Sequence, residues 1–478
     1  MESSTSATAE IEAPAAPRLV MEEDGLPSPQ IWYAAISVWL AIAMTVLDSS
    51  IANVALPTIA RDFGAAPAES IWIVNAYQLA IVTTLLPLAS LGEIVGYRLI
   101  YRAGLVVFTL SSLFCALSQT MAMLTVARTI QGLGAAGVMS VNGALVRHIY
   151  PHSKLGQGIG YNAMVVSASA AIGPTIAAGI LAVGSWPWLF AINIPIGLLA
   201  LAIAWRALPT NTLSERRFDW VSAVLNALMF GLVISGIDVL TRTRARLLGA
   251  LETLAGVVIG ALLVMREITR PRPLVPLDLL RDRMFALSVA TSIVSFAAQM
   301  LAFVGLPFHF ENVLHFNQVQ TGLLLTPWPL AVGVTAPVAG WLADRMSTAI
   351  LCAVGLAIFC GGLVALATLP AGPSSLDIAW RMAVCGVGFG FFQSPNNRMM
   401  LTSAPRARAG AAGGMLGTAR LTGQTIGAVM TAIFLHLFGD TGSVVGLGVA
   451  SGCAAVAALV SLSRTAVRSG AGLREGAA

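Results

Sequence analysis

The carboxylate of Asp48 stands inside a run of mostly apolar and small residues that ends at Pro57. An ionised acid at membrane depth costs about 3 kcal/mol on insertion scales, so such an acid tends to bind a partner or take up a proton. Two interpretations follow: Asp48 handles a proton or cation, or it is a structural acid hydrogen-bonded to a neighbouring helix. The pattern favours the first.

A second polar group lies in a later apolar run, at Arg128 and Gln131. Arg128, Gln131 and Gly132 share one helical face, because residues three and four apart lie on the same side of a helix. A buried guanidinium needs a carboxylate or carbonyl partner, and Asp48 is the candidate carboxylate. Protonation of Asp48 would weaken that attraction and free the helices to move. The alternative is a purely structural arginine.

Aromatic and polar side chains within the apolar runs are candidates for contact with a bound molecule. Aromatic rings can stack on an apolar, flat or cationic ligand, although many serve only in packing. Glu311, near the outer end of its span, is either an acid at the rim of the cavity or an ordinary loop residue. The candidate substrate-contacting residues are Trp72, Tyr77, Gln131, Glu311, Trp328, Gln393, Asn396 and Arg420.

Small residues mark the positions where helices could approach and slide. Ser169, Gly173 and Ala177 are spaced by four, a pattern that allows close helix contact in membranes. Pro174 removes a backbone donor from the same helix. Two similar segments, 89–98 and 340–345, each contain an acid, Glu93 and Asp344, that could pair with nearby arginines and lock one conformation. The expected gating residues are Gly92, Glu93, Gly96, Arg98, Gly132, Gly173, Pro174, Gly340, Asp344 and Arg345.

Composition places all these residues in a membrane. Of the 478 residues, 57% are apolar and 10% are charged, and the mean hydropathy is +0.82. Soluble domains carry about 25% charged residues. Roughly fourteen spans of about 20 residues each would use nearly all the apolar material. No large soluble domain is therefore expected.

The apolar runs predict an all-α polytopic membrane protein with two six-helix bundles, at 30–206 and 285–464. An inserted helix pair, 218–240 and 246–266, lies in the linker region 207–284. The repeated segment at 89–98 and 340–345 supports parallel halves around a midplane cavity. The predicted spans are 31–57, 72–91, 99–118, 122–146, 158–182, 186–206, 218–240, 246–266, 285–307, 318–343, 348–369, 377–400, 411–438 and 443–463.

The arginines predict the orientation of these spans, because cytoplasmic loops carry an excess of Lys and Arg. Most of them fall in loops on one side, among them Arg98, Arg147 and Arg281. Both termini are then cytoplasmic, with a disordered tail at 1–29 and a second tail at 465–478. The cluster 242–246 is an exception on the outer side. Residues 1–29 lack the pattern of a secretory signal, so we expect the first span to be retained.

Enzyme and metal signatures are absent from the sequence. It contains no phosphate-binding GxxxxGK[ST] loop, no HExxH and no CxxC pair. Membrane orientation explains the net charge of +5 better than nucleic-acid binding does. We therefore expect no enzyme activity, metal, cofactor or nucleic-acid partner.

Three motifs, taken in order, carry a family resemblance. They are Leu47–Pro57 (LDSSIANVALP), Arg128–Ala136 (RTIQGLGAA) and Trp188–Gly197 (WLFAINIPIG). The chain resembles the major facilitator superfamily, in particular its fourteen-helix drug:proton antiporter branch. That resemblance implies a major facilitator fold in the bacterial inner membrane, working as a monomer by alternating access. It also implies export of amphipathic, often cationic molecules, driven by the proton gradient, with substrate and proton competing for Asp48.

The sequence departs from the family pattern at two motifs. The loop at 89–98 has Ala89, Glu93, Ile94 and Tyr97 where glycine, aspartate and two basic residues are usual, which would weaken a charge lock. The motif around Gly173 has Ser169 where a glycine is usual, so a proton symporter for uptake remains open. An exporter of a lipid, peptide or metabolite is also open. A non-transporting sensor or an embedded enzyme is the remaining alternative.

Overall fold

The computed structural model describes residues 25–151, 154–211, 213–214, 217–240, 246–270, 276–343, 345–370, 372–403 and 409–475. These residues form helices and connecting turns, and the described ranges contain no strand. Thirteen helical stretches within them are long and apolar enough to cross a membrane. The last stretch, Ala412–Arg464, is 53 residues long and contains two helices in succession.

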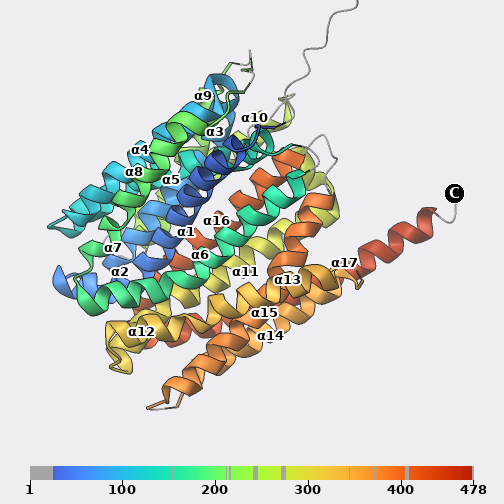
Figure 1. The fold of residues 1–478 in the computed structure, drawn as a ribbon. Coiled ribbons are helices and arrows are strands. Elements are labelled where there is room, and N and C mark those ends of the chain that lie inside the picture. The colour runs from blue at the N-terminus through green and yellow to red at the C-terminus, as the bar shows by residue number, and fades with distance from the viewer. Residues whose placement is uncertain are drawn as a thin grey trace, which may run out of the picture.

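The N-terminal bundle contains six long helices in the region predicted for it (Figure 1). Helix α1 continues past Pro57 to Asp62, because the apolar span alone does not set where a helix ends. Two short helices, α2 and α7, precede α3 and α8. The bounds are α1 (Gln30–Asp62), α2 (Pro67–Ser70), α3 (Trp72–Val95), α4 (Tyr97–Ala116), α5 (Met121–Ile149), α6 (Leu155–Val183), α7 (Pro187–Ala191) and α8 (Asn193–Ala207).

The C-terminal bundle follows the short helix η2 (Leu277–Arg281) and repeats this plan. The predicted span 318–343 is divided between α12 and α13, because Pro327 and Pro329 bring no amide hydrogens to the junction. The bounds are α11 (Arg283–Phe308), η3 (His309–Val313), α12 (Gln318–Leu325), α13 (Pro327–Leu342), α14 (Thr348–Ala367), α15 (Ser375–Ser403), α16 (Ala409–Phe438), η5 (Gly439–Thr441) and α17 (Gly442–Glu475).

The inserted pair, α9 (Trp220–Leu240) and α10 (Arg246–Ile268), lies beside the N-terminal bundle (Figure 1). Asn226 of α9 donates a 2.8 Å hydrogen bond to the Thr83 carbonyl of α3, which fixes the pair to that bundle. Arg266 of α10 contacts Asp219, just before α9, at 3.0 Å. Large apolar side chains of α10, such as Leu247 and Met265, are exposed and would face lipid.

Glycines bring equivalent helices of the two bundles into backbone contact. A Cβ on Gly132 of α5 would lie 2.5 Å from the Tyr77 carbonyl oxygen of α3. A Cβ on Gly386 of α15 would lie 2.1 Å from the Trp328 carbonyl oxygen of α13. Each close approach holds a large aromatic residue in place, and Tyr77 and Trp328 both line the central cavity described below.

Alanine at either glycine should therefore destabilise the protein. Overpacking typically costs about 1–3 kcal/mol, and here the obstructing atom is a backbone oxygen that cannot rotate away. We expect Gly132→Ala and Gly386→Ala each to lower Tm in detergent. Gly333→Ala is the matched control, because no atom lies within 4 Å of its added Cβ. Equal Tm values for all three variants would contradict the packing argument.

Candidate functional site

Asp48 lies in a fully buried polar cluster between α1, α5 and α8. Its carboxylate forms an ion pair with Arg128, and both side chains are 0% exposed. Its Oδ1 atom accepts hydrogen bonds from Gln131 Nε2 at 3.0 Å and from Asn193 Nδ2 at 2.8 Å. The predicted contact between Asp48 and Arg128 is therefore present, and Asn193 is a further member of the cluster that the sequence analysis did not single out.

The Arg128 guanidinium is held from several sides. Its Nη1 donates to Gln131 Oε1 at 2.6 Å, and its Nε donates to the Ile73 carbonyl at 3.2 Å. Its Cζ lies 4.1 Å from the centre of the Tyr77 ring and 5.5 Å from that of Phe190. These contacts compensate a charge that would be very unfavourable alone in the membrane interior. The positive charge of Arg128 is thus compensated mainly by the carboxylate of Asp48.

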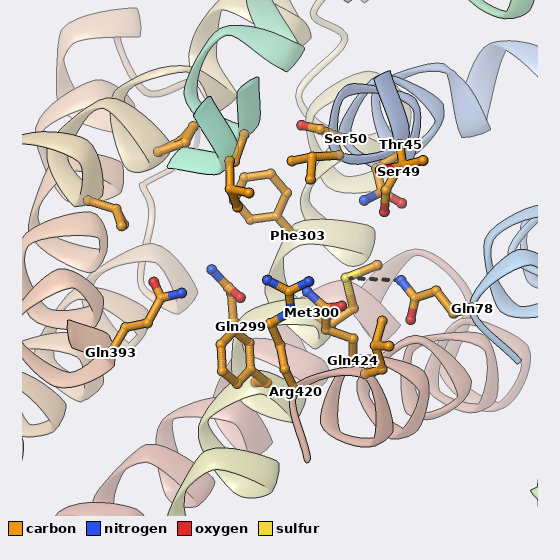
Figure 2. Close-up of a pocket in the computed structure, with 18 of the residues that line it drawn as sticks. Thr45, Ser49, Ser50, Gln78, Gln299, Met300, Phe303, Gln393, Arg420 and Gln424 are labelled. Carbon is orange, nitrogen blue, oxygen red and sulfur yellow. Dashed lines mark hydrogen bonds between the residues drawn. The ribbon is translucent and has the colours of Figure 1, made fainter. Parts of the chain in front are cut away.

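A central cavity lies between the two bundles, and its empty space of about 1100 Å³ includes space open to solvent. Thr45 and Ser49 of α1 line it, whereas Asp48, between them in sequence, is not part of the lining (Figure 2). Tyr77 separates the two sites, because it both lines the cavity and covers the Arg128 guanidinium. The expectation that substrate and proton compete directly for Asp48 therefore does not fit this geometry.

The cavity lining is made of amides, hydroxyls, apolar side chains and one guanidinium. Figure 2 shows Gln299, Arg420 and Gln424 close together, with Gln393 to one side and Gln78 across the cavity. Gln78 and Gln299 were missed as binding residues, and Gln424 was not among the predicted substrate contacts. The signal for Gln424 was in the sequence, because it lies four residues after Arg420 and so shares its helical face.

Four of the eight predicted substrate-contacting residues line this cavity: Tyr77, Trp328, Gln393 and Arg420. The other four lie outside its lining, which corrects their predicted placement. Gln131 is buried beside Asp48, Asn396 accepts a hydrogen bond from Arg464, Glu311 pairs with Arg61, and Trp72 is half-buried at the start of α3.

The predicted gating residues fall into three places. Gly173 packs against Ser50 of α1, and Pro174 follows it in α6. Gly132 packs against α3 as described above. The remaining residues belong to the two repeated segments, 89–98 and 340–345. Gly96 has a φ of 106° between α3 and α4, Glu93 is exposed near the end of α3, and the Arg345 guanidinium lies 4.0 Å from the centre of the Trp341 ring. Gly92 is buried and Arg98 is half-buried. A Cβ added to Gly340 would lie 3.1 Å from Ser394 Oγ, and Asp344 lies outside the described residues.

Three polar contacts join the two bundles at the end that carries α2 and α12. Arg61 Nη2 contacts Glu311 Oε2 at 2.6 Å, with the Glu311 side chain only 1% exposed. Thr58 donates to Gln318 Oε1 at 2.9 Å, and the hydroxyls of Thr175 and Thr326 are 2.9 Å apart. Together these contacts close this end of the path between the bundles.

Comparison with known proteins finds relatives that match most of the chain and are named as transport or export proteins. A sequence profile described as the Major Facilitator Superfamily matches residues 38–428. The uncharacterized transporter YebQ of Escherichia coli is 54% identical over 92% of this chain and 97% of its own length. The riboflavin transporter RibZ of Clostridioides difficile is 30% identical over 86% of this chain and 89% of its own. The tetracenomycin C resistance and export protein of Streptomyces glaucescens is 31% identical over 86% and 77%.

Solved structures match in fold at low sequence identity. A peptide transporter POT in complex with alafosfalin has a TM-score of 0.68 at 14% identity, covering 91% of this chain and 93% of that one. A bacterial homologue of the human lysosomal transporter Spinster has a TM-score of 0.64 at 14% identity, over 92% and 99%. At these identities the likeness concerns the fold alone.

Proposed function

This chain belongs to the Major Facilitator Superfamily, and from that membership we propose that it is a proton-coupled transporter that exports small amphipathic molecules by alternating access. The family confirms the predicted all-helical fold and a transporter rather than an enzyme. The chain is a multi-pass protein of the bacterial inner membrane. We further propose fourteen crossings, both termini in the cytoplasm, action as a monomer, and no cofactor besides the proton gradient.

The buried ion pair between Asp48 and Arg128 is the main observation that supports proton coupling. Protonation of Asp48 would remove the negative charge that compensates Arg128 and would leave a guanidinium at membrane depth. The cluster joins α1, α5 and α8, so its loss would change how these helices pack. A proton is thereby linked to the conformation of the bundle.

Tyr77 supplies the proposed connection between proton and substrate. Its hydroxyl donates to the Thr45 carbonyl of α1 at 3.2 Å, its ring covers Arg128, and it lines the cavity. A substrate that displaces Tyr77 would disturb the ion pair without touching Asp48. We therefore propose indirect coupling in place of direct competition at the carboxylate.

The closed end beside Glu311 is the outer end if the termini are cytoplasmic. The conformation described here would then receive substrate from the cytoplasm, which is the state an exporter loads. One proton moving down about 150 mV supplies roughly 3.5 kcal/mol. That energy supports about a 300-fold gradient of a neutral substrate, since about 1.4 kcal/mol corresponds to tenfold.

Uptake by symport is the second candidate. The relatives include one protein named as a riboflavin transporter, a name that gives no direction, and another named for export of tetracenomycin C. The replacement of glycine by Ser169 in α6 also leaves symport open.

Flux of protons in purified liposomes tests the proposal. The protein is reconstituted with a pH-sensitive dye inside and an imposed pH gradient, and anionic, neutral and cationic amphiphiles are added in turn. We expect a substrate to trigger proton movement opposite to its own. Proton movement in the same direction as the substrate would make the protein a symporter. Substrate flux that ignores the pH gradient would contradict proton coupling altogether.

A further inference from the structure

The charge of the central cavity comes from one residue. Among the residues that line it, Arg420 of α16 is the single charged side chain, and none is an aspartate or glutamate. Figure 2 shows its guanidinium directed into the cavity beside Gln299 and Gln424. The buried Nε of Arg420 has no hydrogen-bond partner in the described part of the chain.

No acid among the residues that line the cavity offsets that charge. Asp48, the buried acid of the N-terminal bundle, is occupied by Arg128, Gln131 and Asn193. A cation in the cavity would therefore meet an uncompensated guanidinium, whereas an anion would supply the carboxylate or similar group that Arg420 lacks. Like charges at close range in a low-dielectric interior repel strongly. The cavity is consequently suited to an anion, the opposite of the cationic substrates that the family resemblance implies.

The uncharged residues of the lining indicate the chemistry of the rest of the ligand. Four glutamines, Gln78, Gln299, Gln393 and Gln424, come from both bundles and can each donate and accept hydrogen bonds along a polar edge. Phe303, Trp328 and other aromatic residues form apolar walls. Trp328 and Phe303 are already in edge contact, with ring centres 5.3 Å apart. Apolar walls with a few polar groups are typical of sites that bind small organic ligands, and aromatic walls favour flat rings that can stack on them.

We propose that the cavity binds planar aromatic acids and that Arg420 pairs with their anionic group. The proposal rests on the transport function proposed above and names the substrate class for the same cavity. Arg420 is suited to this role because its planar guanidinium can bind both oxygens of a carboxylate. The glutamines select among such acids through carbonyl and amino groups on the ring.

Two xanthene dyes of similar shape and opposite charge test this assignment. Fluorescein is an anion at pH 7.5 and rhodamine 123 is a cation, and the binding of each to purified protein in detergent is followed by fluorescence anisotropy. We expect fluorescein to bind at least roughly tenfold more tightly than rhodamine 123. A charge-assisted hydrogen bond of the usual strength corresponds to roughly 10- to 100-fold in Kd, so Arg420→Gln should weaken fluorescein binding by that factor.

Two variants separate charge from general damage. Arg420→Lys retains the charge but loses the planar fork, so it should bind fluorescein more tightly than Arg420→Gln does. Arg102→Gln is the matched control, because the Arg102 guanidinium donates to the backbone carbonyls of Ala204 and Trp205, outside the cavity. That variant should bind both dyes as the unmodified protein does.

Tighter binding of rhodamine 123 than of fluorescein by the unmodified protein would overturn the proposal, whatever the variants do. So would fluorescein binding that Arg420→Gln leaves unchanged. The equilibrium measurement needs no gradient, so it is independent of proton coupling. Fluorescein that binds through Arg420 but moves in liposomes without proton exchange would keep the substrate class and refute the coupling. Proton-coupled flux of cationic dyes without flux of fluorescein would keep the proton coupling and refute the substrate class.

Discussion

Replacing Asp48 with asparagine should abolish proton-coupled transport and also lower the stability of the protein. Asparagine keeps an oxygen that can accept from Gln131 and Asn193, so the local shape is retained. It leaves the charge of Arg128 buried without a carboxylate, since both partners are 0% exposed. Removing one partner of a buried pair typically costs about 3–5 kcal/mol. We expect a lower Tm in detergent and no substrate-triggered proton flux in liposomes.

A second substitution separates the two effects. In Asp48→Asn combined with Arg128→Met, no charge remains at the site, and the methionine lies between the rings of Tyr77 and Phe190. Replacing a buried ion pair by apolar side chains is often neutral for stability, so Tm should recover towards the original value. Proton-coupled flux should not recover, because no group is left to take up the proton.

Asp377 provides a matched control for the loss of a paired acid. It contacts Arg381 four residues later at 3.1 Å, near the start of α15, where both side chains are partly exposed. Asp377→Asn should change Tm and flux little, because exposed pairs contribute about 0–1 kcal/mol. Full proton-coupled flux in Asp48→Asn would remove Asp48 from the coupling role, even if stability fell as expected.

The buried ion pair was predictable from the sequence because the constraint on it is local. A charged residue inside an apolar run has few acceptable partners, and Asp48 and Arg128 were the clear candidates in the same half of the chain. The helix pair α9 and α10 was predictable for a similar reason, since apolar runs of sufficient length leave little choice of structure. In both cases the lipid surroundings restrict the structure, because they disfavour unpaired charges and unpaired backbone polar groups.

The cavity was less predictable because it depends on how helices are rotated against one another. Gln78 and Gln299 belong to different bundles and meet only after the halves pack. The pairing of Arg61 with Glu311 likewise spans 250 positions in the chain. Asp48 itself lies behind Tyr77, a relation that no spacing along α1 reveals. Sequence patterns locate the polar residues, but packing decides which of them a substrate can reach.

Closure of the end beside α12 depends on a glycine that no sequence motif indicated. A Cβ on Gly322 of α12 would lie 2.9 Å from the Pro174 carbonyl oxygen and 2.9 Å from Ala178 Cβ, both in α6 of the other bundle. Valine there cannot be accommodated without separating α12 from α6. Because Arg61 and Glu311 meet at the same end, that separation should also break their contact.

We therefore expect Gly322→Val to shift the protein towards a state that is open at this end. Overpacking costs about 1–3 kcal/mol, and if that cost falls only on the closed state, the ratio of the two states changes by roughly 5- to 150-fold. Spin labels at the exposed positions Val183 and Val313 should report longer distances between the bundles. Turnover should fall, since the proposed alternating access requires the closed state in every cycle.

Gly179→Val provides the control for this experiment, because Gly179 is in α6, the helix that Gly322 of α12 packs against, and nothing lies within 4 Å of its added Cβ. It introduces the same side chain close to the same interface but does not push α12 away from α6. Label distances in Gly322→Val that match those of Gly179→Val would mean that α12 can shift without opening the bundles. The closed end would then be held by polar contacts such as Arg61 to Glu311, and Glu311→Gln, which removes the charge of that pair, should open it in turn. Longer distances in Gly322→Val alone would assign closure to the fit of two backbones, with the ion pair forming as a consequence of that fit.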